Sequence, residues 1–142
     1  MRSMNFLGKK PAHTRPPAPD AAGSSTTRQR GNAAEDQALA FLQAAGLKLL
    51  ERNYRTPGRG GGEIDLVMRD RDGTLVFVEV RARSSARFGG AAASIGAGKC
   101  RRLRQAAEAF LLTRSRPLPP CRFDAVCFEG SDEPVWLRQI DV

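Results

Sequence analysis

The sequence predicts an α/β domain in which a mixed β-sheet is flanked by helices. Two segments with helical periodicity are separated by three strand-like segments, and two more strand-like segments follow the second helix. The strand-like segments alternate in polarity, and glycine or proline marks the turns between them. The chain has 142 residues, of which 41% are hydrophobic, so it suits one domain with an ordinary core.

Residues 1–30 predict a disordered basic tail rich in proline and alanine, and residues 31–142 predict the folded domain. The tail holds six basic residues and one acidic residue, so most of the formal charge of +8 lies outside the domain. A modestly basic domain with a basic tail favours an anionic partner such as nucleic acid. The tail could be a basic arm on nucleic acid, but a leader without a role is the simpler reading.

Cysteine and histidine usage excludes several kinds of site. Cys100, Cys121 and Cys127 are an odd number without Cys-x-x-Cys spacing, which argues against structural zinc and against a disulfide framework. His13 is the only histidine and lies in the tail, so histidine is excluded as a general base in the domain. No apolar run is long enough for a signal peptide or a membrane span. We therefore expect a cytoplasmic protein that does not enter a membrane.

Asn32 can cap a first helix that runs to about Ala45, where Gly46 provides a left-handed stop. Glu35 falls at the buried edge of the apolar stripe rather than on the polar face. A glutamate in the first turn is favoured by the helix dipole alone, but its position near the core makes a role in a site a competing explanation. The stripe consists of Ala34, Ala38, Phe41, Leu42 and Ala45.

A β-hairpin is the central element of the prediction. Residues 47–54 predict a first strand and the glycine-rich residues 56–62 a loop, after which residues 61–68 and 75–83 form the hairpin around a turn at 69–73. If Asp65 lies opposite Glu79, then Val67 meets Phe77, which keeps the apolar pairs together. This register sets two carboxylates about 5 Å apart, which is destabilising without a cation. The hairpin therefore predicts a metal ion bound by Asp65 and Glu79.

A second helix is expected over residues 98–113, and the prolines at 117–120 end it. Lys99 lies at the N-terminal edge of its apolar stripe, from where it can snorkel to solvent or reach the hairpin carboxylates or a bound phosphate. Strands over residues 121–128 and 135–140 complete the sheet. The stripe consists of Cys100, Leu103, Ala106, Ala107, Phe110 and Leu111.

The charged residues that face the core form a chemically coherent set. Carboxylate oxygens are hard ligands suited to Mg²⁺ or Mn²⁺, and Mg²⁺ needs only one or two protein carboxylates. Such an ion activates water and neutralises charge on a scissile phosphate. The set predicts phosphodiester hydrolysis, with the candidate catalytic residues Glu35, Asp65, Glu79, Arg81 and Lys99.

The motifs Gly62-Glu63-Ile64-Asp65-Leu66-Val67 and Val76-Phe77-Val78-Glu79-Val80-Arg81-Ala82-Arg83 resemble those of the bacterial YraN family, as do Gly31–Glu35, Lys99 and Arg122-Phe123-Asp124. That family is similar to the PD-(D/E)XK nucleases and to archaeal Holliday-junction resolvases. The resemblance covers about residues 31–142 and implies a restriction-endonuclease-like fold. It also implies that Asp65 and Glu79 hold the metal, and that Glu35 orients water or a second ligand.

Arg81 departs from the superfamily pattern, which ends in lysine. Arginine stays charged and cannot act as a general base, although it can brace a phosphate, and Lys99 could supply the missing ammonium. The leading hypothesis is a Mg²⁺- or Mn²⁺-dependent endonuclease on DNA, with branched DNA suggested only by the resolvase resemblance. Its candidate nucleic-acid contacts are Arg59, Arg83, Arg101 and Arg102.

Two other function classes stay open. A catalytically weak or inactive module of the same fold would bind nucleic acid without cutting it, and Arg81 favours this reading. A structural or interaction protein would keep its carboxylates solvated and indifferent to metal. The sequence also leaves open a homodimer.

Overall fold

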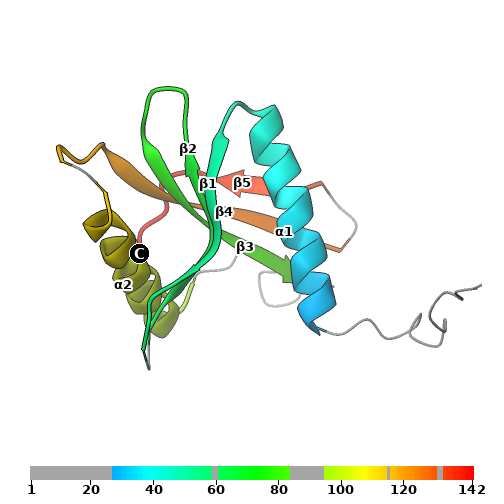
Figure 1. The fold of residues 1–142 in the computed structure, drawn as a ribbon. Coiled ribbons are helices and arrows are strands. Elements are labelled where there is room, and N and C mark those ends of the chain that lie inside the picture. The colour runs from blue at the N-terminus through cyan, green and yellow to red at the C-terminus, as the bar shows by residue number, and fades with distance from the viewer. Residues whose placement is uncertain (1–26, 59–60, 84–94, 115, 131–132) are drawn as a thin grey trace, which may run out of the picture.

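A computed structural model describes residues 27–58, 61–83, 95–114, 116–130 and 133–142. These residues form one five-stranded sheet in the order β1-β2-β3-β4-β5, with two helices (Figure 1). The predicted α/β class, a mixed sheet flanked by helices, is confirmed. The elements in chain order are α1 (Thr27–Ala44), β1 (Lys48–Arg55), β2 (Glu63–Arg69), β3 (Leu75–Arg83), α2 (Ala97–Leu112), β4 (Cys121–Glu129) and β5 (Val135–Leu137).

The sheet is mixed because one connection crosses over. β1, β2 and β3 form an antiparallel meander, β3 and β4 are parallel, and β5 returns antiparallel to β4. A parallel pair needs a long connection, which here contains α2. β3 is therefore the central strand, with β4 along its whole length and β2 along residues 75–78.

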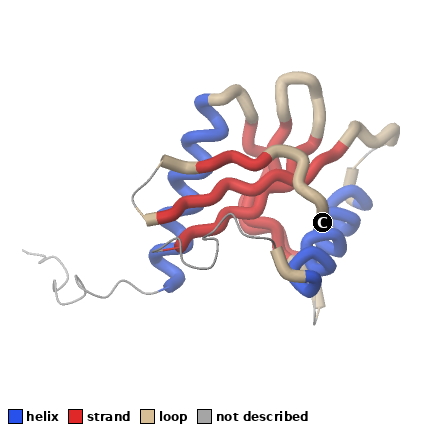
Figure 2. Tube along the Cα trace, turned by 180° about the vertical axis from the view of Figure 1, so that it is seen from behind, coloured by secondary structure: helices blue, strands red, loops and turns tan. Residues whose placement is uncertain are grey.

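The two helices cover opposite faces of the sheet, as the view from behind also shows (Figure 2). Ala38 and Leu42 of α1 pack with Leu66 and Val78 in one cluster. The stripe of α2, with Leu103 and Phe110 as its largest buried members, packs on Phe77 and Val67 in another. Both predicted stripes are thus confirmed at their centres. No helix within the described ranges is long and apolar enough to cross a membrane.

Several predicted boundaries were wrong. α1 begins at Thr27, not after Asn32, so residues 27–30 lie in a helix rather than in the predicted tail; residues 1–26 lie outside the described residues. α2 is displaced by only one residue from the predicted 98–113. The last strand ends at Leu137 rather than at residue 140, because Gln139 adopts a left-handed backbone with φ 55° and donates its N–H to Asp124.

The side chains of β1 switch from one face of the sheet to the other at Asn53. Arg52 contacts Asp36 of α1, whereas Tyr54, only two residues later, packs edge-on against Phe110 of α2. In a regular strand two such residues would share a face. Asn53 lies between them with φ 55°, and the neighbouring pairs in the register place it across from Asp65. β1 bends visibly along its length (Figure 1). The paired strands β1 and β2 therefore change the face to which their side chains point at Asn53 and Asp65, from the α1 side to the α2 side.

Candidate active site

The predicted hairpin register is confirmed where it is regular. Val67 pairs with Phe77, and the ladder continues to Leu66 opposite Val78, one residue before the two carboxylates. At Asp65 the ladder stops, and Oδ2 of this residue accepts the N–H of Val80 at 2.8 Å. Beyond the regular ladder the carboxyl groups of Asp65 and Glu79 remain within side-chain hydrogen-bonding reach of each other, and Asp65 also caps the end of the ladder. The ladder ends here because the side chains of β2 change face at Asp65.

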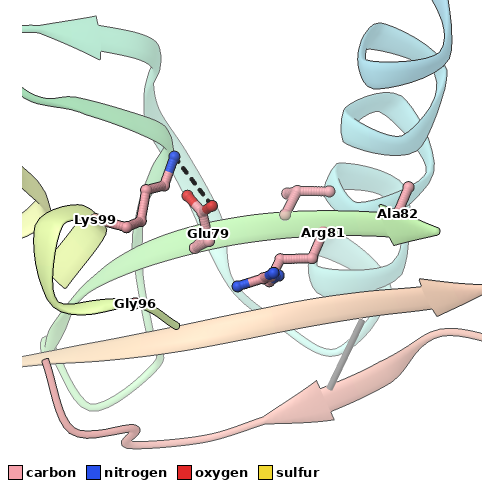
Figure 3. Close-up of a pocket in the computed structure, with 6 residues that line it drawn as sticks. Glu79, Arg81, Ala82, Gly96 and Lys99 are labelled. Carbon is pink, nitrogen blue, oxygen red and sulfur yellow. Dashed lines mark ion pairs between the residues drawn. The ribbon is translucent and has the colours of Figure 1, made fainter. Parts of the chain in front are cut away.

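Glu79 is buried beside this cap, with 7% of the residue exposed. Lys99 of α2 places its Nζ 3.2 Å from Oε2 of Glu79, which confirms that this lysine reaches the hairpin carboxylates (Figure 3). The other oxygen, Oε1, is buried and has no hydrogen-bond partner among the described residues. Buried polar atoms are nearly always satisfied, so this oxygen requires a partner, which can be a proton shared with Asp65 or a ligand.

The acidity of the pair reflects burial and mutual repulsion. Burial, followed by the charge of Asp65, raises the pKa of Glu79 to about 7, and Lys99 offsets part of this rise. Burial also raises the pKa of Asp65, although the N–H of Val80 opposes the shift. A carboxylate pair that resists full ionisation in this way gains from a divalent cation, which would neutralise both groups.

Glu35 lies close to the pair from the α1 side. Its side chain is 13% exposed, as expected for the buried edge of the stripe. Asn53 Nδ2 donates to its Oε1 at 3.0 Å, and Arg52 Nε lies 3.6 Å from the same oxygen. Burial and the charge of Asp65 raise the pKa of Glu35, and Arg52 opposes the rise. The helix, the hairpin and β1 therefore bring three carboxyl groups into one neighbourhood.

An open pocket of about 580 Å³ lies over β3 next to Glu79. Arg81 lines it and lies beside Cys127 of β4 in the register. Figure 3 shows the Lys99 ammonium against the Glu79 carboxylate and the Arg81 guanidinium on the β4 side of β3. The two cations thus flank the pocket from different elements. It is lined by Glu79, Val80, Arg81, Ala82, Gly96 and Lys99.

The predicted nucleic-acid contacts are only partly placed. Arg101 and Arg102 are exposed on α2, next to Lys99. Arg83 ends β3, but its side chain, like all of Arg59, lies outside the described part of the chain. Sequence reasoning missed Asn53 and Arg52, which hold Glu35. An asparagine inside a strand pattern was the available signal, because asparagine tolerates a left-handed backbone better than most residues.

The donor set fits a hard divalent cation. Asp65 and Glu79 offer carboxylate oxygens, and the buried Oε1 of Glu79 lacks any other partner within the described ranges. No group of three or more Asp, Glu, His or Cys residues in these ranges could hold an ion by itself. Mg²⁺ keeps several waters and accepts one or two protein carboxylates together with substrate oxygens, so two carboxylates suffice.

Comparison with known proteins gives one consistent family. Residues 34–128 match the family described as "Uncharacterised protein family UPF0102". A UPF0102 protein of Paracidovorax citrulli (strain AAC00-1) is 67% identical over 118 residues, which cover 83% of this chain and 86% of the relative. A UPF0102 protein of Acidovorax sp. (strain JS42) is 59% identical over 135 residues, which cover 95% of this chain and 96% of the relative. The matched range spans the positions of Glu35, Asp65, Glu79, Arg81 and Lys99.

Proposed function

The chain belongs to the UPF0102 family, the YraN family that its motifs resemble, and on this premise we propose that it is a metal-dependent endonuclease that hydrolyses DNA phosphodiesters. The observation that carries the proposal is the buried pair of Asp65 and Glu79, in which Oε1 of Glu79 has no partner among the described residues. A protein pays for such an arrangement in stability, and perturbed buried carboxylates next to a pocket are typical of functional sites.

Each side chain of the site has a role that follows from its chemistry. Asp65 and Glu79 would hold Mg²⁺ or Mn²⁺, which when bound supplies an activated water and neutralises charge on the scissile phosphate. Lys99 would move its ammonium from Glu79 towards the phosphate, where it balances the charge that develops in the transition state. Arg81 would brace a phosphate oxygen from the β4 side of the pocket, and Glu35 would orient the attacking water.

Arg81 supports a second candidate, a nucleic-acid-binding module that keeps the fold without turnover. Arginine keeps its charge in proteins and therefore cannot accept the proton of water. In the first candidate Lys99 supplies the mobile ammonium instead. The two candidates share the substrate class, suggested by the basic residues next to the pocket, and differ only in whether the phosphodiester is cut. Branched DNA is the first substrate to test.

Binding of Mn²⁺ is the first measurement. Mn²⁺ at 100 times its dissociation constant should stabilise the native state by about 2.7 kcal/mol, seen as a higher melting temperature. Asp65→Asn should lose most of this response, because it removes one of the two ligands. Asp141→Asn is the matched control, since Asp141 is an exposed carboxylate outside the site. Equal responses in the wild type and in Asp65→Asn would refute the metal site.

Cleavage separates the two candidates. Purified protein with Mg²⁺ or Mn²⁺ should cut at least one of duplex, single-stranded, flap and four-way DNA. Lys99→Met should lower the rate about 10²-fold or more, while Arg81→Lys should retain or increase it. No cleavage by the wild type, with cleavage appearing in Arg81→Lys, would establish the binding module. Cleavage that persists in Glu79→Gln would show that the activity lies elsewhere.

A further inference from the structure

The backbone of Asn53 is unusual for its place in the fold. Asn53 is in the middle of β1 and has φ 55°, a left-handed conformation that non-glycine residues rarely adopt. Such a residue costs on the order of 1–3 kcal/mol and persists only where its surroundings hold it. Glycine would adopt this backbone without the cost. Asparagine tolerates this backbone better than most residues, and what it offers beyond glycine is its side-chain amide.

The side chain of Asn53 makes one specific contact. Its Nδ2 donates to Oε1 of Glu35 at 3.0 Å, across 18 residues of sequence. An ionised carboxylate only accepts hydrogen bonds, so the amide nitrogen is the atom that must face Glu35. Arg52 Nε approaches the same oxygen at 3.6 Å. Both contacts fall on Oε1 of Glu35.

The charges around Glu35 explain why it needs to be held. Asp65 repels Glu35, and Arg52 attracts it. Arg52 also binds the exposed Asp36 at 2.6 Å, which draws the guanidinium towards solvent. Without a neutral donor at Asn53, repulsion by Asp65 and attraction by Arg52 would both move the Glu35 carboxylate away from the hairpin. The amide adds a hydrogen bond at a fixed point without adding charge.

We propose that Asn53 is a positioning residue whose amide holds Glu35 beside Asp65 and Glu79. The left-handed backbone lies opposite Asp65, where the side chains of β1 and β2 change face, and the same residue directs its amide to α1. The role given to Glu35 in metal and water binding rests on the proposed function, whereas the coupling of Asn53 to Glu35 does not. Removal of a group that orients a metal ligand typically lowers metal affinity or activity by about 10–100-fold.

The test is the variant Asn53→Gly, which keeps the left-handed backbone and removes only the amide. Gln139→Gly is the matched control, because Gln139 is exposed, also has φ 55°, and lies outside the site. In Asn53→Gly the Mn²⁺ dissociation constant, measured by electron paramagnetic resonance, should rise about 10-fold. In the metal-free protein the pKa of Glu35, measured by NMR of labelled glutamate, should rise because the ionised form loses a donor. Gln139→Gly should change neither value.

A double-mutant cycle shows whether Asn53 acts through Glu35. The variant with both Asn53→Gly and Glu35→Gln should bind Mn²⁺ no more weakly than Glu35→Gln alone. Additive losses, or an unchanged Glu35 pKa in Asn53→Gly, would overturn the inference. If the wild type binds no Mn²⁺, the proposed function fails together with the role of Glu35 in it. In that case a higher Glu35 pKa in Asn53→Gly would still establish the coupling of the two residues.

Discussion

Asp124 and Glu79 are buried carboxylates on the neighbouring strands β4 and β3, but they are surrounded very differently. Glu79 lies beside Ala125 and Val78 beside Asp124 in the register, so the two side chains point to opposite faces of the sheet. Asp124 accepts hydrogen bonds from Arg122 Nε, Trp136 Nε1 and the N–H of Gln139, at 2.9–3.2 Å. Glu79 has the Lys99 ammonium on one oxygen and no described partner on the other.

The difference separates a structural carboxylate from one that is available for binding. Each oxygen of Asp124 has two donors, and the same Arg122 also pairs with Asp70 at 3.0 Å, so this network fixes the turn after β5. The Glu79 site keeps an unsatisfied oxygen and a repulsive neighbour, both of which destabilise the metal-free protein. Burial alone therefore does not distinguish the two carboxylates, whereas their hydrogen-bond partners do.

The strongest test of this comparison is Asp124→Ala. It leaves the Arg122 guanidinium, whose side chain is only 15% exposed, with Asp70 as its remaining counter-charge and without its fully buried partner. Removing one partner of a buried ion pair costs about 3–5 kcal/mol, so the free energy of unfolding measured with urea should fall by that amount. Asp124→Asn keeps the shape and should cost less. A loss below about 1 kcal/mol in Asp124→Ala would show that the network is not structural.

Glu79→Gln should raise the free energy of unfolding of the metal-free protein, whereas Asp124→Ala lowers it. The folded-state pKa of Glu79 is about 7, above its ordinary value of 4.5, so its contribution to stability is complete below pH 4.5 and is lost as the pH rises through 7. Glutamine does not ionise, so at pH 8 in EDTA the free energy of unfolding of the variant should exceed that of the wild type by about 3 kcal/mol. Urea unfolding at pH 4 and pH 8 measures this difference. An equal difference at both pH values would contradict the assignment.

Trp136→Phe should have the smallest effect of the three. It removes the indole N–H that Asp124 Oδ2 accepts at 2.9 Å, but it leaves Arg122 and the Gln139 N–H in place. Loss of one hydrogen bond to a charged acceptor costs about 1.5 kcal/mol, which urea unfolding can resolve. Mn²⁺ affinity should not change, because Asp124 faces away from the site. A change in Mn²⁺ affinity would mean that the two carboxylates are coupled.

The sequence predicts the parts of this molecule in which residue types repeat with the spacing of a strand or a helix. Alternation in the hairpin gave the correct pairing of Val67 with Phe77, and helical spacing placed Lys99 within reach of Glu79. Both results depend on the regular geometry of strands and helices, which a pattern of residue types reveals. The presence of Glu35 at a buried edge followed from the same reasoning and is confirmed.

The features that the sequence did not predict are those that break a period. Asn53 has a left-handed backbone at one residue of β1, opposite the point where the regular β2–β3 ladder ends at Asp65. The Asp65 carboxylate therefore accepts the N–H of Val80 in addition to lying beside Glu79. Left-handed backbone at a non-glycine residue leaves no periodic trace in a sequence. For the same reason the early end of β5, caused by the backbone of Gln139, was missed.

The irregularity of β1 also bears on the solubility of the folded protein. β1 is an edge strand, and a straight edge offers its free N–H and C=O groups to strands of other molecules, which leads to aggregation. The register of β1 with β2 shifts between Leu49 and Glu51, and the backbone turns again at Asn53. These two interruptions leave no long flat segment to act as a template. A homodimer built by joining β1 edges into a continuous sheet is therefore disfavoured, and the bend that shapes the site protects the edge as well.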